Sequence, residues 1–259
     1  MIWDQFDLTL IVPALLAGAL VLSTHVPLGQ EVLKRGIIFI DIAIAQIAAL
    51  GVIAATVLGG ELASWQIQFC AGLSAVLGAG FIHYLEQYHA KDLEALIGVL
   101  FVLAASGGLI LASYAANSDE LLHELLVGQI LWVNTEQLLW VTALYAPLLL
   151  LWFTSRTKRS PLLFYLIFSL IVTASVQLIG VYLVFASLIL PALATQTIKN
   201  PKKRLFYAYI TGLTGFILGL LSSVMFDFPT GAITVWMLLL SCLFARLLFA
   251  RAITKTLVK

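Results

Sequence analysis

Stretches of about 20 mainly apolar residues recur along almost the whole chain, and this repetition constrains the fold more than any other feature. A helix that crosses a bilayer needs about 20 such residues, because the hydrocarbon layer offers no water to its backbone groups. We predict such helices at residues 8–28, 37–58, 64–84, 94–115, 134–153, 161–177, 204–226 and 231–250. The chain is therefore expected to be an all-α, polytopic transmembrane helical bundle.

The composition agrees with this expectation. Of the 259 residues, 62% are apolar and only 10% are charged, whereas soluble domains are about 45–50% apolar and about 25% charged. The connecting segments are too short for a soluble domain, so we expect residues 1–259 to form a single transmembrane domain. A net charge of +1 offers no basic surface for nucleic acid. The first apolar stretch lacks the pattern of a cleaved signal peptide and is expected to be a retained helix.

One further apolar segment, residues 181–196, is shorter and contains Pro191. We expect a membrane-embedded helix that opens at Pro191 and returns the chain to its previous side, which gives eight or nine membrane helices. Orientation follows from the basic residues, because cytoplasmic loops are enriched in Lys and Arg. With the N-terminus outside, the C-terminus inside and this return helix in place, all 14 Lys and Arg residues face the cytoplasm.

Local signals mark helix starts and helix contacts. Ser160 precedes Pro161, which is a favourable pair at the start of a helix, and Asn134 precedes the stretch at 134–153 in the same way. Gly215 and Gly219 lie one turn apart and predict a close contact between helix backbones.

The cytoplasmic segment at residues 191–204 combines a proline, small residues and a basic loop. Small side chains would let another surface approach closely, although an ordinary basic loop that obeys the positive-inside rule would look the same. The residues that would form this surface are Pro191, Ala192, Ala194, Lys199, Lys202, Lys203 and Arg204.

The chain resembles a known family at this segment and in four other places. Residues 176–204, VQLIGVYLVFASLILPALATQTIKNPKKR, resemble the coupling region of permease subunits from ATP-binding-cassette importers of the zinc/manganese/iron class. The stretches at 26–51, 95–111, 125–133 and 227–236 resemble other parts of these permeases, in the same order. The resemblance therefore covers nearly the whole chain.

This resemblance implies a homodimeric permease in a bacterial cytoplasmic membrane. Its partners would be two cytoplasmic ATPase subunits, acting on residues 191–204, and a metal-binding solute-binding protein outside. The chain contains no G-x-x-x-x-G-K-S/T phosphate-binding motif, so it is not expected to be an enzyme, and ATP is expected to act only through the partner subunit. The expected cargo is a divalent transition metal, zinc first and manganese second, with no covalently bound cofactor.

The family's usual ligand pair is absent from the second helix. Family members carry an Asp and a His one turn apart, which suits zinc or manganese, but here those positions hold Ile42 and Gln46. Asp41 lies one residue before the expected place and about 140° around a helix from Gln46, so the two cannot bind one ion together. We expect both to face the translocation path. A structural hydrogen bond or a position near the cytoplasmic interface remain alternatives for Asp41.

Other acidic residues are further candidates for contact with metal. Glu94 matches an acidic family position and would be a carboxylate at the inner mouth, unless it only places a negative charge at a helix N-terminus. Glu120, His123 and Glu124 would share one side of a helix and form a patch that attracts metal at the outer mouth or a docking face for the binding protein. The alternative is a solvated acidic surface.

The chain also departs from the family between residues 153 and 169, where a further cytoplasmic stretch is usual. We expect a divergent branch with reduced contact to its ATPase. Two other functions remain open: an importer of iron or chelated metal in the same family, and an ion-coupled secondary transporter. The second class typically shows inverted repeats and several embedded charges, which we do not find. A membrane enzyme would need a cluster of His, Asp and Glu at one depth, and none can be assembled.

Overall fold

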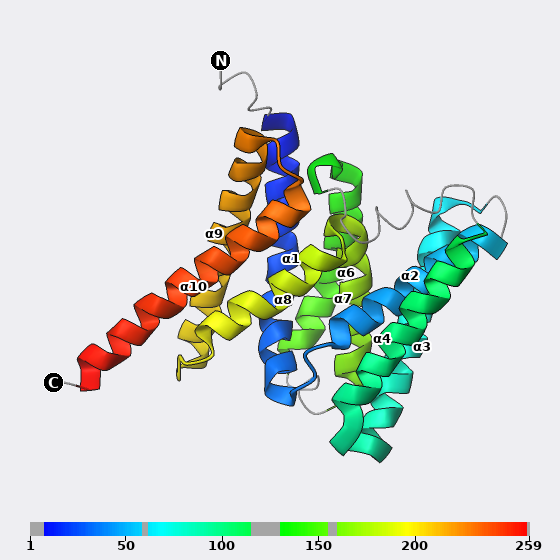
Figure 1. The fold of residues 1–259 in the computed structure, drawn as a ribbon, viewed down its shortest axis with the longest axis horizontal. Coiled ribbons are helices and arrows are strands. Elements are labelled where there is room, and N and C mark those ends of the chain that lie inside the picture. Colours follow the sequence, from blue (N-terminus) through cyan, green and yellow to red (C-terminus); the bar gives the residue numbers. More distant parts are fainter. Residues whose placement is uncertain (1–7, 59–61, 115–129, 155–159, 258–259) are drawn as a thin grey trace. The chain divides into compact units, whose positions relative to one another are not determined.

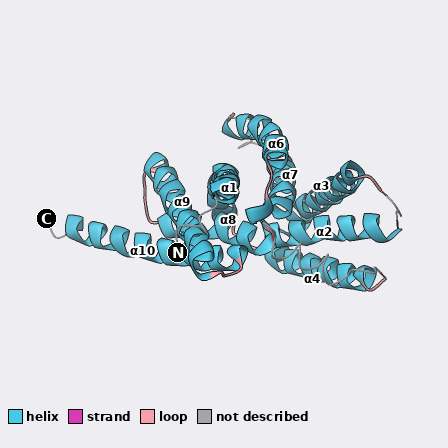
Figure 2. Cartoon of the chain, turned by 90° about the horizontal axis from the view of Figure 1, so that it is seen from above, coloured by secondary structure: helices cyan, strands magenta, loops and turns pink. Residues whose placement is uncertain are grey.

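A computed structural model of the chain describes residues 8–58, 62–114, 130–154 and 160–257 (Figure 1). Regular structure in these ranges is helical throughout and includes no strand (Figure 2), which confirms the all-α prediction. The α-helices are α1 (Leu8–Arg35), α2 (Ile40–Leu58), α3 (Ser64–His89), α4 (Leu93–Ala112), α6 (Thr135–Phe153), α7 (Pro161–Ile179), α8 (Val181–Thr195), α9 (Pro201–Phe226) and α10 (Thr230–Leu257). Two short 3-10 helices, η2 (Ala90–Asp92) and η3 (Ile130–Trp132), complete them.

Each predicted apolar stretch is helical. In the described part of the chain, 7 stretches are long and apolar enough to cross a membrane, and one of them, Ser64–Ala112, contains both α3 and α4. Helix α8 is shorter, with 15 residues. A total of eight or nine crossings depends on counting α3, α4 and α8 separately, so this number stays a prediction.

The helices form two compact units, each described here by itself. The first consists of residues 1–35, 129–140 and 178–259, and the second of residues 36–128 and 141–177. Helices α1, α8, α9 and α10 dominate the first unit. Helices α2, α3 and α4, most of α6 and nearly all of α7 form the second. The expectation of a single domain stays a prediction.

Small residues bring helices together in the first unit. Gly29 of α1 lies against the backbone carbonyl of Leu188 in α8, where a Cβ would collide with the carbonyl oxygen. A Cβ on Gly215 of α9 would lie only 2.7 Å from the Cα of Leu238 in α10, and Gly219 meets Thr234 in the same way. The predicted close backbone contact at Gly215 and Gly219 is therefore confirmed.

Helix α8 corrects one expectation, because it continues through Pro191 instead of opening there. Pro191 has no amide to bond the carbonyl four residues earlier, but membrane helices tolerate such a loss where neighbouring helices cover the site. Pro191 is buried beside Gly212 of α9, and the hydroxyl of Thr195 donates to the Pro191 carbonyl at 2.9 Å. The turn therefore comes after Thr195.

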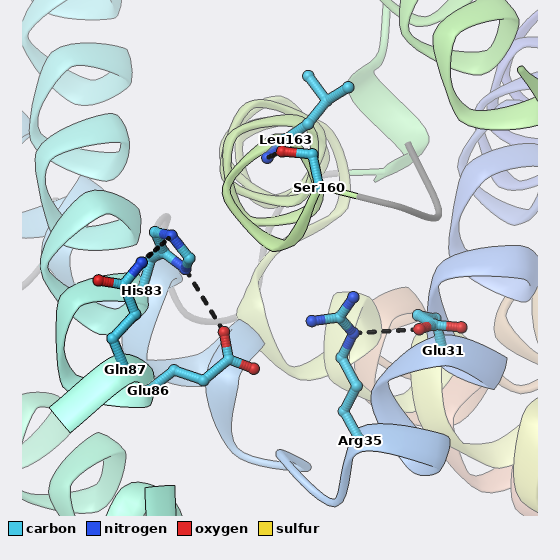
Figure 3. Close-up of polar contacts among 7 residues, drawn as sticks. All are labelled: Glu31, Arg35, His83, Glu86, Gln87, Ser160 and Leu163. Atoms are coloured by element: carbon cyan, nitrogen blue, oxygen red, sulfur yellow. Dashed lines mark hydrogen bonds and ion pairs between the residues drawn. The ribbon is translucent and has the colours of Figure 1, made fainter. Parts of the chain in front are cut away.

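Side-chain caps fix the starts of three helices. Asn200 Oδ1 accepts hydrogen bonds from the amides of Lys202 and Lys203 at 3.0 and 3.2 Å and so caps α9. Asn134 caps α6 by accepting from the amide of Gln137 at 2.8 Å. Ser160 Oγ accepts from the amide of Leu163 at 3.4 Å at the start of α7 (Figure 3). The helix starts predicted at Asn134 and Ser160 are confirmed.

In the second unit, α2 packs against both α3 and α4. Tyr145 of α6 is buried and hydrogen-bonds to Ser175 Oγ and to the carbonyl of Ile171 in α7. His83 of α3 contacts Glu86 and Gln87 on its own helix (Figure 3), and its ring lies 5.6 Å from that of Tyr165 in α7. The hydrogen bonds of Tyr145 link α6 to α7, and the ring contact of His83 with Tyr165 links α3 to α7.

Candidate functional site

Asp41 is a buried carboxylate in the first turn of α2. Its side chain is 1% exposed, and neither oxygen has a hydrogen-bond partner of normal geometry among the described residues. The first amides of an α-helix have no acceptor within the helix, and Asp41 lies among them. Asp41 therefore lies close to one end of its helix, where the positive end of the helix dipole favours a negative charge.

Glu94 brings a second carboxylate to the same place. It lies in the first turn of α4, and its Oε1 accepts a hydrogen bond from the amide of Phe39 at 3.2 Å. Phe39 comes directly before α2 and two residues before Asp41, so Glu94 reaches the start of the helix that carries Asp41. The other oxygen, Oε2, is buried and has no hydrogen-bond partner in the described chain. Both acidic residues thus gather at the starts of α2 and α4.

This arrangement offers three carboxylate oxygens without partners: Oδ1 and Oδ2 of Asp41, and Oε2 of Glu94. Oxygen donors of this kind suit hard divalent cations such as manganese. The described residues include no group of three or more His, Cys, Asp or Glu side chains that could hold a metal ion.

Gln46 lies five residues beyond Asp41 in the same continuous helix and is partly buried. The angle of about 140° expected from the sequence therefore holds, and Gln46 cannot share an ion with Asp41 on α2 alone. Its place in the translocation path stays a prediction. Glu120, His123 and Glu124, the expected outer patch, lie outside the described residues.

The residues of the expected coupling surface divide into two sets. Pro191, Ala192 and Ala194 are buried in the first unit, where the Cβ of Ala192 faces Gly29 of α1. Lys199, Lys202 and Lys203 are exposed after α8 and on the first turn of α9, and Arg204 is half-buried beside them. Any contact with an ATPase would therefore be made by the basic residues, with the small residues packing behind them.

Sequence reasoning missed the approach of Glu94 to the start of α2. It had treated Asp41 and Gln46 as one group and Glu94 as another, because 55 residues separate Phe39 from Glu94. The one available signal was the acidic residue at the expected start of a span.

His25 is another buried ionisable residue. It is 0% exposed, its Nδ1 lies 3.0 Å from the Val21 carbonyl, and its Nε2 has no partner among the described residues.

Comparison with known proteins identifies the family. Residues 7–160 and 155–250 match the ABC 3 transport family. The chain is 30% identical over 243 residues to the manganese transport system membrane protein MntC of Halalkalibacterium halodurans. The aligned region covers 86% of this chain and 80% of that protein. It is 26% identical over 229 residues to the protein of the same name from Listeria monocytogenes, which covers 80% of this chain and 79% of that one.

The fold has a solved counterpart. PsaBC from Streptococcus pneumoniae, determined in complex with Fab, superposes with a TM-score of 0.75 at 23% sequence identity, and the match covers 95% of each chain. The family match spans both compact units and all the described helices up to residue 250 of α10. The chain is therefore a multi-pass membrane protein and belongs to the ABC 3 transport family as a permease.

Proposed function

We propose that this chain is the membrane-spanning subunit of an ATP-driven importer of a divalent transition metal, and that Asp41 and Glu94 contact the ion on its way through. The observation that carries the proposal is the approach of Glu94 to the start of α2, the helix that carries the buried Asp41, with three carboxylate oxygens that have no hydrogen-bond partner of normal geometry among the described residues. An ionisable residue within a membrane segment is costly and normally serves transport.

Manganese is the cargo that the donor set supports best. Zinc, the first choice from the sequence, favours nitrogen and sulfur ligands in tetrahedral sites, whereas carboxylate and water oxygens suit manganese. The names of the two relatives, both membrane proteins of manganese transport systems, support the same choice. Zinc remains the second candidate.

The partners follow from the family and from the distribution of charge. We propose a homodimer that binds two cytoplasmic ATPase subunits and, on the other side, a solute-binding protein that carries the metal. The N-terminus would lie outside and the C-terminus inside, with Lys199, Lys202 and Lys203 toward the ATPases. Movement of the ATPases would shift α8 and α9 between outward and inward openings.

The experiment is reconstitution of the purified chain with its candidate ATPase in liposomes, followed by elemental analysis of the lumen after ATP addition. We expect ATP-dependent accumulation of manganese, with less zinc. A control without ATP measures leakage, and a control with the ATPase alone measures metal that binds to it. No ATP-dependent accumulation of any metal would reject the proposed function.

A further inference from the structure

A cavity of about 260 Å³ lies in the first unit, where the end of α1 meets the end of α8 and the start of α9. Its walls are formed by Gln30, Leu33, Lys34, Ala192, Gln196 and Arg204. A water molecule occupies about 30 Å³ in the liquid. The cavity can therefore hold a group several times larger than one water.

Two of the residues that line this cavity carry buried hydrogen-bond donors without acceptors. Nε2 of Gln30 and Nε of Arg204 are buried, and neither has a hydrogen-bond partner in the described part of the chain. Buried donors without acceptors destabilise a fold, so such a pair is expected where an acceptor from outside completes the site.

Charge favours an anion as that acceptor. The side chain of Lys34, which lines the cavity, is 76% exposed, and its Nζ lies 3.7 Å from Glu31, so this exposed ion pair leaves the ammonium accessible to a ligand. Glu31 also pairs with Arg35 at 3.1 Å and does not line the cavity (Figure 3). Two cationic and two amide side chains, from α1, α9 and the residue after α8, therefore belong to the lining of one cavity, a donor set that matches the oxygens of a phosphate group.

The position of the cavity favours a lipid as the source of the phosphate. It lies at the ends of two helices that can cross a membrane, Leu10–Arg35 and Pro201–Phe226. Phe206 and Tyr207, two and three residues after Arg204, are 61% and 38% exposed, and aromatic side chains gather at the level of the lipid headgroups. Basic pockets between membrane helices on the cytoplasmic side bind anionic headgroups.

We propose that this cavity binds the phosphate group of an anionic phospholipid from the adjoining leaflet. Arg204 Nε and the Gln30 amide donate to the phosphate oxygens, Lys34 closes the mouth and Gln196 supplies a further amide. Such a lipid would fasten α1 to the junction between α8 and α9. The site concerns the lipid environment of the chain and is independent of which metal it carries.

The test measures phosphatidylglycerol bound to the purified, delipidated full-length chain by native mass spectrometry during titration. We expect Arg204→Gln and Gln30→Leu each to weaken binding at least tenfold relative to the wild type. Arg204→Lys keeps the charge but loses Nε, and should weaken binding nearly as much. Gln196→Leu should also weaken binding. Because Gln196 is exposed, that loss cannot be assigned to misfolding. The control Arg246→Gln removes an exposed charge from α10 of the same unit and should bind within twofold of the wild type.

Three results would overturn the proposal. Wild-type binding in both Gln30→Leu and Arg204→Lys would mean that lipid is held only by general charge. Displacement of phosphatidylglycerol by an equal concentration of inorganic phosphate would assign the cavity to a soluble anion. Unchanged lipid binding in Arg204→Gln, together with a tenfold loss of affinity for the candidate ATPase, would assign it to a carboxylate of that partner.

Discussion

The Glu94 side chain accepts a hydrogen bond from the backbone amide of Phe39 at 3.2 Å, which ties the start of α4 to the start of α2. The same carboxylate therefore has two separable roles. One oxygen accepts a hydrogen bond from the backbone before α2, and the other is buried with no hydrogen-bond partner among the described residues. Substitutions of different shape and charge can distinguish the structural role from contact with a transported ion.

Glu94→Gln should keep the structural role and lose the transport role. Its amide oxygen can still accept from Phe39, but the negative charge is gone, so we expect a stable protein whose manganese uptake falls by about tenfold or more. Glu94→Ala removes both roles and should also cost about 1 kcal/mol of stability through the lost hydrogen bond. Uptake into proteoliposomes and thermal unfolding in detergent measure the two effects.

Glu136→Gln is the matched control, because Glu136 is an exposed acidic residue in the first turn of α6. It should transport like the wild type. Uptake in Glu94→Gln equal to that of this control would remove Glu94 from the translocation path and leave only its contact with Phe39.

Asp41→Asn should stabilise the protein while it impairs transport. Asp41 is 1% exposed and its carboxylate has no hydrogen-bond partner of normal geometry in the described chain; the cost of burying such a charge exceeds the stabilisation of about 0.3–1 kcal/mol that a helix N-terminus gives it. Asparagine has nearly the same shape without the charge, so the unfolding midpoint in detergent should rise by a few degrees while manganese uptake falls. A lower midpoint together with lower uptake would show instead that Asp41 is needed to hold the fold.

Much of this architecture could be predicted from the sequence, because apolar runs of membrane length and turn residues act locally. Such local signals predicted the eight long stretches, the short helix at 181–196 and the capping residues Asn134 and Ser160. The continuation of α8 through Pro191 could not be predicted, since it depends on the burial of Pro191 against other helices, including α9 at Gly212. Proline alone favours an opening.

The candidate site was predictable only residue by residue. Asp41 and Glu94 could be singled out because carboxylates are rare in apolar runs. Their approach could not be predicted, because it depends on how α2 packs against α4. The exposure of the basic residues after α8 was expected, whereas the burial of Ala192 and Ala194 depends on tertiary packing around α8.

Gly29→Ala should destabilise the first unit. The new Cβ would collide with the Leu188 carbonyl oxygen, and backbone cannot move away as a flexible side chain can. We expect a loss of about 1–3 kcal/mol, measured as a lower unfolding midpoint. Gly72→Ala is the control, because nothing lies within 4 Å of a Cβ at this position of α3. Alanine there should be neutral or stabilise the helix by up to about 1 kcal/mol. Equal midpoints for the two variants would contradict the close contact of α1 with α8.

Reversing the charge of Lys202 and Lys203 should uncouple the permease from its ATPase. Both side chains are exposed on the first turn of α9, while Arg204 stays in place at the cavity. Glutamate is favourable at a helix N-terminus, so Lys202→Glu with Lys203→Glu should not unfold α9. We expect normal membrane insertion but loss of permease-stimulated ATP hydrolysis. Reversal of Arg246 on α10 is the control, and full stimulation in the double variant would exclude these lysines from the coupling surface.

The most direct test of the central claim, that Asp41 and Glu94 contact the same transported ion, is a double-mutant cycle on the rate of ATP-driven manganese uptake. Residues that act as a unit are strongly non-additive. We predict that Asp41→Asn combined with Glu94→Gln transports no more slowly than the slower of the two single variants. A double variant whose loss equals the product of the two single losses would show that the carboxylates act independently and would contradict the claim.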